Sequence, residues 1–396
     1  MKNELITTLK DLIRINSISG NEKEISEYIE NFFKKNNIPY TTQKVEEDRY
    51  NLIVTLGEGE KTIIFNGHID TVNYNESQWR ITPPLNPKEI DGKLYGLGSL
   101  DMKGAVSCMM MLAKKYSKQK LDKKVLFTFV VGEEVNGIGA EKLGPYLIKQ
   151  GIDPLKSEAI ICEPTDLKLS LGNKGNFFVD GKIIGIGGHS SNPNKCKNPI
   201  DALCELKNIT NDITEKLVPY QDSLGKALAV ITYVCANAKY SLDQNKIQVG
   251  SRNQIPPYAE FCLDIRPGEN LWKDHFQILE NIVENSFANL REQGYEIKLT
   301  YPIKLIGHRT PENMKIKEII TIYMNDKGKK LETIFANGAN DSFAFQNEGI
   351  NTINEFGPGK KCDPNGNALM HAPDEYVEIS ELMKGIEIYQ KIIDDF

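Results

Sequence analysis

The chain has 396 residues, a formal charge of −6 and a hydrophobic fraction of 40%. Its length corresponds to two or three domains of about 150 residues, and the charge, without any long Lys/Arg run, argues against nucleic acid as the main partner. No apolar segment approaches the roughly 20 residues that span a bilayer, and the amphipathic N-terminus lacks the apolar run of a secretory signal. We therefore expect a cytoplasmic protein with no membrane partner that acts on small molecules.

The N-terminal part of the chain predicts an α/β domain. Residues 4–15 and 24–35 each place apolar side chains on one helical face, and Ser19–Glu22 has the pattern of a capping box between the two helices. Short β-rich runs then flank a helix at about 101–116; they are 51–56, 62–65, 125–131 and 159–162. Strands that alternate with helices predict a sheet that is mostly parallel.

The pattern changes after residue 172. A strand (177–186), a helix (198–217), two strands (227–236 and 254–265), a helix (273–293) and a strand (295–301) follow one another. This order, β-α-β-β-α-β, is the ferredoxin-like arrangement. We expect a catalytic domain of residues 1–174 and 303–396 and an inserted α+β lid or dimerisation domain of residues 175–302, because the candidate ligand His371 must return to the first sheet.

Acidic residues and histidines lie just beyond several apolar runs of the expected catalytic domain. They are His68, Asp70, Asp101, Glu133, Glu134, Glu163 and, after the turn-rich segment 356–369, His371. Ligands gather at the carboxyl ends of strands in open α/β sheets. A two-metal hydrolase site needs a bridging carboxylate, terminal His and carboxylate ligands, and a carboxylate that deprotonates water, and this set offers each of them.

The spacing of these residues indicates individual roles. In an extended segment Asp70 points to the same side as His68 and can accept its second ring N–H, although an Asp here could also simply cap a turn. Asp101 alone would be a helix N-cap, and with two metals it would be the bridge. Adjacent carboxylates repel one another, so Glu133 and Glu134 fit a site where one binds metal and its neighbour contacts the bridging water.

Five segments carry a resemblance to a known family: GHIDTV (67–72), SLDMKGA (99–105), GEE (132–134), CEPT (162–165) and MHAPDEYV (370–377). They are similar to segments of the two-zinc deacylase and exopeptidase family of acetylornithine deacetylase, succinyl-diaminopimelate desuccinylase, aminoacylase and carboxypeptidase G. The resemblance covers nearly the whole chain.

The resemblance implies a role for each residue of the metal site. His68 and Glu163 would hold one metal, Glu134 and His371 the other, and Asp101 would bridge them. Asp70 would orient His68, and Glu133 would be the general base. The metals are expected to be two divalent ions, zinc first, with cobalt or manganese as alternatives that accept the same N and O ligands.

The resemblance also implies a role for His189, which would reach the active site of the partner subunit of a homodimer and stabilise the oxyanion. Without the resemblance, a His in the segment Gly187–Ser191 would be a mobile surface residue. His275 and His308 match no motif, and we interpret them as structural.

Two departures from the family affect the expected substrate site. The chain has Leu97 where the family commonly has Arg, and it reads Gly338-Ala339-Asn340-Asp341 where the family often has Gly-Thr-x-Asp. The missing Thr hydroxyl puts the family's usual substrate-carboxylate contact in doubt at that position. The resemblance implies Arg266 and Asn253 as carboxylate or amide anchors, and we expect Gly338 beside them in the substrate site. An Arg suits bidentate carboxylate binding, although at a strand end it is more often only solvated.

The seven cysteines predict reduced thiols, because their number is odd and the sequence contains no C-x-x-C pair. Cys162 could be a soft metal ligand beside Glu163. Adjacent residues of a strand point to opposite faces, so we interpret Cys162 as a buried strand residue.

We expect a metal-dependent amidohydrolase that removes an acetyl- or succinyl-like group from an N-acyl amino acid or diamino acid. The sequence around Glu163 and Lys174 is most similar to the acetylornithine deacetylase branch of the family. A dipeptidase or carboxypeptidase of the same family is the alternative, and a non-catalytic binding protein on this fold is a second one.

Overall fold

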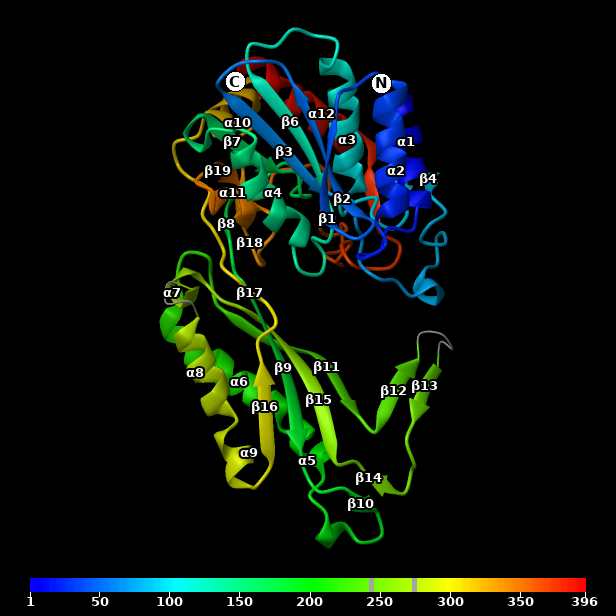
Figure 1. Cartoon of the computed structure of the whole chain (residues 1–396), viewed down its shortest axis with the longest axis vertical. Coiled ribbons are helices and arrows are strands. Elements are labelled where there is room, and N and C mark those ends of the chain that lie inside the picture. The colour runs from blue at the N-terminus through cyan, green and yellow to red at the C-terminus, as the bar shows by residue number, and fades with distance from the viewer. Residues whose placement is uncertain (242–245, 273–275) are drawn as a thin grey trace. The chain divides into compact units, whose positions relative to one another are not determined.

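The computed structural model describes residues 1–241, 246–272 and 276–396, which form two compact units (Figure 1). Unit 1 comprises Met1–Gly172, His308–Ala336 and Asn340–Phe396, and unit 2 comprises Asn173–Gly307 and Asn337–Ala339. Unit 2 contains the whole of the expected inserted segment and also Gly338, which we had expected in the catalytic domain. His275 and the start of the expected helix 273–293 lie outside the described residues.

A six-stranded sheet forms the centre of unit 1, with the strand order β1-β2-β6-β3-β7-β19. The strands are β1 (Thr41–Glu46), β2 (Arg49–Leu56), β6 (Lys124–Val130), β3 (Thr62–His68), β7 (Ser157–Ile161) and β19 (Asn351–Ile353). Strands β6, β3, β7 and β19 are parallel neighbours, and β1 and β2 add an antiparallel edge. The predicted α/β class with a mostly parallel sheet is confirmed.

Helices cover both faces of this sheet, because alternate strand residues are apolar on both sides. One core contains Ile63 and Phe65 of β3 together with residues of α1 (Lys2–Arg14), α2 (Lys23–Lys35), α3 (Lys103–Tyr116), α10 (Lys315–Asp326) and α12 (Ile379–Asp395). The other core contains Ile64 of β3 and residues of α4 (Ile138–Lys149) and α11 (Ser342–Gln346). The result is three layers, helix on sheet on helix.

Two small sheets complete unit 1 at its loops. Strands β4 (Lys88–Ile90), β5 (Lys93–Tyr95) and β20 (Tyr376–Glu378) form one sheet, and β8 (Leu169–Asn173) pairs with β18 (Thr333–Ala336) in the other. The pairing of β20 with β5 brings the segment after His371 beside the segment before Asp101.

The register of the parallel strands positions the candidate site. His68 ends β3 and lies opposite Val130, which ends β6, and Asn66 lies opposite Ile161, which ends β7. The carboxyl ends of the three strands therefore meet at one edge of the sheet.

Unit 2 has a four-stranded antiparallel sheet with the order β11-β15-β9-β16, to which β17 (Lys304–Leu305) adds a short pairing. The four strands are β9 (Asn176–Ile184), β11 (Leu228–Ala236), β15 (Tyr258–Arg266) and β16 (Glu296–Thr300). The helices that supply its core are α5 (Pro199–Cys204), α6 (Leu206–Leu217), α7 (Glu269–Trp272), α8 (Gln277–Ser286) and α9 (Ala288–Glu292). The predicted ferredoxin-like order is confirmed.

Three expected elements of unit 2 are divided. The described part of the expected helix 273–293 is α8 and α9. The expected helix 198–217 is α5 and α6, and the expected strand 254–265 is β14 (Gln254–Ile255) and β15, separated by Pro256 and Pro257, which have no N–H for a ladder. Strand β14 pairs with β10 (Gly188–His189), and β12 (Ala238–Ser241) pairs with β13 (Lys246–Val249). Across the described ranges, no helix is long and apolar enough to span a membrane.

The expected capping box at Ser19–Glu22 is wrong. Helix α2 has Glu22 as its N-cap residue and no side-chain cap hydrogen bond. The Glu22 carboxylate instead accepts hydrogen bonds from the guanidinium of Arg49, a charge-assisted pair that is stronger than a neutral cap. The Ser19 hydroxyl donates to Asp70 Oδ2 at 2.6 Å.

Candidate metal centre

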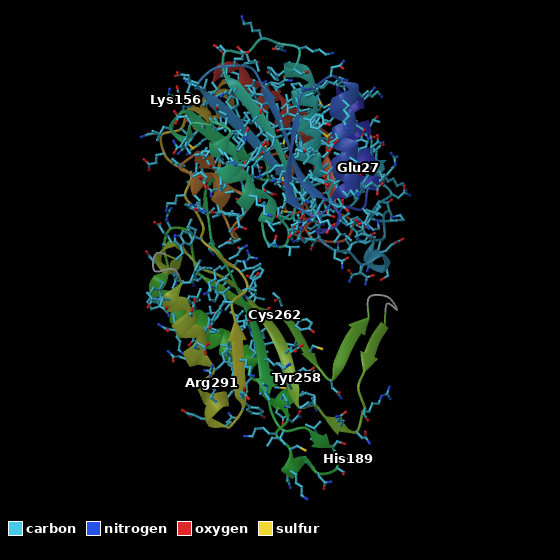
Figure 2. All side chains as sticks on the ribbon, viewed as in Figure 1. Glu27, Lys156, His189, Tyr258, Cys262 and Arg291 are labelled. Atoms are coloured by element: carbon cyan, nitrogen blue, oxygen red, sulfur yellow. The ribbon has the colours of Figure 1, made fainter. Side chains whose placement is uncertain are left out.

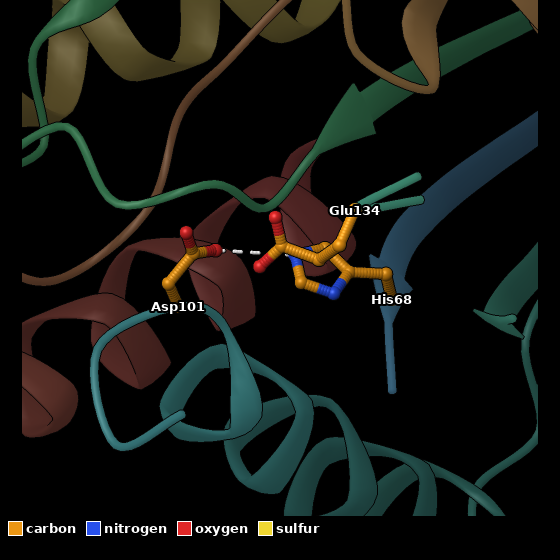
Figure 3. Close-up of side chains that lie close together, drawn as sticks. All are labelled: His68, Asp101 and Glu134. Atoms are coloured by element: carbon orange, nitrogen blue, oxygen red, sulfur yellow. Dashed lines mark hydrogen bonds and ion pairs between the residues drawn. The ribbon is translucent and has the colours of Figure 1, made fainter. Parts of the chain in front are cut away.

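Asp101 lies between two histidines, just before the start of α3. Its Oδ1 is 3.1 Å from Nε2 of His68, and its Oδ2 is 3.2 Å from Nε2 of His371. Figure 3 shows His68, Asp101 and Glu134, which come from separate segments of unit 1. One carboxylate that offers each of its oxygens to a different histidine has the geometry of a bridge.

A further carboxylate lies beside each histidine. Glu163 Oε1 is 3.4 Å from His68 Nε2, and Glu134 Oε2 is 2.9 Å from His371 Nε2. The five side chains therefore form two similar groups, each with one imidazole nitrogen, one terminal carboxylate and one oxygen of Asp101.

These spacings fit a pair of metal ions. Two ligand atoms that each lie about 2.0–2.2 Å from one tetrahedral zinc ion are roughly 3.3 Å apart. The four distances between ligand atoms, from 2.9 to 3.4 Å, lie around this value. The donor set of imidazole and carboxylate also suits zinc, cobalt and manganese.

The charge of the site supports the same reading. Burial raises the pKa of Glu163 to about 8 and also raises the pKa of Glu133 and Glu134, with neighbouring carboxylates adding to the effect. Hydrogen bonds from its ring to the carboxylates of Asp101 and Glu134 raise the pKa of His371 to about 10. Carboxylates gathered in a buried site are costly to ionise unless cations compensate them, and two divalent ions would do so.

The ring of His68 lies closer to the backbone carbonyl of Asp70 than to its carboxylate, and the orienting role of that carboxylate stays a prediction. Nδ1 lies 3.0 Å from the backbone carbonyl oxygen of Asp70 and 3.6 Å from its carboxylate, so the carbonyl is the hydrogen-bond acceptor. The tautomer is the expected one, because Nδ1 carries the proton and Nε2 stays available. The Asp70 carboxylate instead accepts the backbone N–H groups of Glu133 and Glu134.

Glu133 lies close to the group formed by His68 and Glu163. One of its carboxylate oxygens, a nitrogen of His68 and an oxygen of Glu163 lie within 4.8 Å of one another. This position is compatible with a ligand as well as with a base. Cys162 lies just past the end of β7, is fully buried, and its thiol contacts the carbonyl of Ile160. The seven cysteines, all within the described residues, form no disulfide.

The expected substrate residues Asn253, Arg266 and Gly338 belong to unit 2, as does His189. The side-chain amide of Asn253 is 3.3 Å from Nε2 of His189, an exposed residue labelled in Figure 2. Arg266 ends β15 and its guanidinium binds Asp264 at 2.7 Å. A Cβ at Gly338 would come too close to this guanidinium, so any larger residue there would require the Arg266 side chain to shift.

Three acidic or hydroxyl residues near the metal site were not assigned a role in that site from the sequence. Ser19 binds the carboxylate of Asp70, and Asp341 accepts a hydrogen bond from Asn66 at 2.8 Å. Glu375 accepts three backbone N–H groups from the loop that carries Asp101. The motif around His371 contains Glu375, but only the folded chain shows what it binds.

Comparison with known proteins places the chain among metal-dependent hydrolases. The family model described as peptidase family M20/M25/M40 matches residues 64–395. A probable succinyl-diaminopimelate desuccinylase of Staphylococcus aureus is 26% identical over 98% of this chain and 96% of its own length. An acetylornithine deacetylase of Buchnera aphidicola is 26% identical over 99% of this chain and 97% of its own length.

A solved structure has the same fold. A Bacillus subtilis protein described as a dinuclear metal binding peptidase from the M20 family superposes with a TM-score of 0.62 at 17% identity, and the match covers 99% of this chain and 97% of that one. At this identity the likeness shows the fold alone.

Proposed function

The chain belongs to peptidase family M20/M25/M40, and from this premise we propose that it removes an acetyl- or succinyl-like acyl group from an N-acyl amino acid or diamino acid. The placement of Asp101 between His68 and His371 carries the proposal, because a carboxylate with one oxygen facing each histidine is the central ligand of a two-metal hydrolase. The relatives described as a desuccinylase and an acetylornithine deacetylase support the substrate class.

We propose that His68 and Glu163 hold one divalent ion, that Glu134 and His371 hold the other, and that Asp101 bridges them. When bound, the two ions would polarise the amide carbonyl and lower the pKa of the attacking water. Zinc is the expected metal, with cobalt and manganese as alternatives.

Glu133 would act as the general base. Its carboxylate would take a proton from the attacking water and pass it to the leaving amine as the C–N bond breaks. Burial raises the pKa of Glu133, which makes its carboxylate a stronger acceptor for the proton of the attacking water. Asp70 would hold Glu133 in place through the backbone.

Arg266, Asn253 and Gly338 would bind the substrate, and Arg266 would pair with a substrate carboxylate. His189 would donate a hydrogen bond to the oxyanion from the partner subunit. A homodimer through unit 2 is supported by the edge strand β11, where Val230 and Val234 are exposed. Exposed apolar edge strands are templates for pairing with another chain. We also propose a cytoplasmic location.

A substrate panel tests this function. The purified protein, loaded in turn with zinc, cobalt or manganese, is given N-acetyl and N-succinyl amino acids and diamino acids and a set of dipeptides, and the released amine is measured. We expect the highest kcat/KM for one N-acyl amino acid or diamino acid. Faster cleavage of dipeptides would favour the alternative, a dipeptidase or carboxypeptidase, which the fold shared with a peptidase also supports. No turnover on any substrate would favour a non-catalytic binding protein.

A further inference from the structure

Glu375 lies four residues after His371 and has no part in the chemistry proposed above. Its side chain is buried, with 1% of the residue exposed. Oε1 accepts the backbone N–H groups of Leu100 and Asp101, at 2.7 and 3.0 Å, and Oε2 accepts that of Gly98 at 3.1 Å. One carboxylate thus holds three amides of a four-residue segment.

The backbone of the same residue strengthens the attachment. The carbonyl of Glu375 accepts the N–H of Gly96, and the next residue, Tyr376, pairs with Tyr95 in the small sheet. Gly98 has φ +75°, where a Cβ would collide with Thr71. The segment is therefore bent so that its N–H groups converge on Glu375, as in other anion-binding backbone nests.

The segment that Glu375 holds ends at the proposed bridge. Asp101 must present one oxygen to His68 and the other to His371, and a shift of its backbone would move both oxygens together. The chain from 371 to 375 carries both a terminal ligand and the anchor of the bridge. It can therefore set the distance between His371 and Asp101 without other elements.

We propose that Glu375 is a positioning residue that fixes Asp101 between the two metal positions by holding the backbone of Gly98–Asp101. The inference depends on the proposed two-metal site. It predicts that Glu375 controls the affinity for metal without being a ligand, as residues that orient ligands from behind do.

The neighbouring residue offers a matched control. Asp374 also accepts two backbone N–H groups, those of Arg80 and Ile81, each at 2.9 Å. It belongs to the same turn and has the same charge, but it holds a segment that carries no proposed ligand. Loss of Asp374 should disturb the turn without moving Asp101.

The test compares Glu375→Gln and Asp374→Asn in the full chain. In Glu375→Gln an NH₂ group replaces one carboxylate oxygen. This group is a donor and cannot accept a hydrogen bond from the backbone N–H that it faces. Cobalt and zinc affinities are measured by calorimetry, and the absorption spectrum of bound cobalt reports its coordination. We expect Glu375→Gln to lose about 10–100-fold in affinity at one or both sites, with an altered cobalt spectrum, and Asp374→Asn to stay within about twofold of the wild type.

Wild-type affinity and spectrum in folded Glu375→Gln would overturn the proposal, and so would an equal loss in Asp374→Asn. If Glu375→Gln does not fold, Glu375→Asp keeps the charge, shortens the reach and must show the same loss. Failure of both variants to fold would assign Glu375 to fold stability and also overturn the proposal. Metal binding is measured without substrate, so a wild type that binds two metals but cleaves nothing would refute only the proposed function.

Discussion

The carboxylate of Asp70 accepts the backbone N–H of Glu133 through Oδ1 at 3.2 Å and that of Glu134 through Oδ2 at 3.2 Å. The hydroxyl of Ser19 donates to the same Oδ2. Asp70 is fully buried, and its pKa is lowered despite that burial, first by the ring of His68 and then by the hydrogen bonds from Ser19 and Glu134. Asp70 therefore holds the turn that carries both the proposed base and a proposed ligand.

We expect Asp70→Asn to lower kcat by about 10–100-fold, because an amide NH₂ cannot accept one of the two N–H groups. Metal content should stay close to that of the wild type, since the ring of His68 is bonded to the backbone carbonyl of residue 70. Ser19→Ala is the control. It removes one hydrogen bond to Asp70, so the free energy of unfolding should fall by only about 0.5–1.5 kcal/mol. Loss of metal from Asp70→Asn would show that its carboxylate orients His68 after all.

Glu133→Ala and His371→Ala separate the base from the ligands. We expect Glu133→Ala to abolish turnover and to keep its metal, because a base acts on water and does not hold the ion. His371→Ala should lose metal, because its site has few protein ligands. Elemental analysis of both variants makes the distinction. Metal loss from Glu133→Ala would exchange the roles proposed for Glu133 and Glu134, which the proximity of Glu133 to His68 leaves open.

Metal binding should release protons. Without metal, hydrogen bonds to Asp101 and Glu134 raise the pKa of His371 to about 10, and burial raises the pKa of Glu163 to about 8. Both groups are then largely protonated at pH 7 and must lose their protons to become ligands, so affinity should rise with pH between about 6 and 8. Calorimetry in two buffers of different ionisation enthalpy counts the protons. A binding enthalpy that is independent of the buffer would contradict this expectation.

The sequence predicted the parts of the molecule that follow from local pattern. The helices, the parallel strands and the strand ends at His68 and Glu163 could be read from periodicity and from the rule that ligands gather at the carboxyl edge of a parallel sheet. Contacts between distant segments could not be read this way. Ser19 resembles a helix cap in its local sequence, but Asp70, 51 residues away, accepts its hydroxyl. The role of Glu375 depends on a strand pairing between β5 and β20 that no local pattern encodes.

A different long-range contact, the buried ion pair between Glu22 and Arg49, predicts a large effect on stability. Glu22 is fully buried, and Arg49 donates to both of its oxygens, at 2.8 and 2.6 Å. Glu22→Ala would leave a partly buried guanidinium with one remaining partner, Glu46. We expect the free energy of unfolding to fall by about 3–5 kcal/mol, as measured by urea denaturation.

Lys23→Ala is the matched control in the same helix. It removes the ion pair between Lys23 and Asp48, in which both side chains are more than half exposed. Ion pairs between exposed side chains are screened by solvent and contribute little, so this variant should unfold close to the wild-type midpoint. Equal losses in the two variants would mean that the burial of Glu22 does not matter.

The final prediction concerns His189, the one proposed catalytic residue in unit 2. Its Nδ1 accepts the backbone N–H of Ser191 at 3.2 Å, which leaves Nε2, 3.3 Å from the side-chain amide of Asn253, as the ring nitrogen that would donate to the oxyanion. An oxyanion donor contributes about 10²–10³-fold to kcat, so His189→Ala should lose that much activity and keep its metals. All the proposed metal ligands belong to unit 1. If His189 serves the partner subunit, an active site combines two chains.

Mixing the inactive Glu133→Ala and His189→Ala proteins under conditions of subunit exchange tests this arrangement. A hybrid dimer would contain one intact site, with Glu133 from one chain and His189 from the other. Random exchange makes about half of the dimers hybrid, so about one quarter of wild-type activity should return in a symmetric dimer. Mass spectrometry of the mixture confirms exchange independently. If hybrids form and activity does not return, His189 acts within its own chain, because each site of the hybrid dimer then lacks either Glu133 or His189.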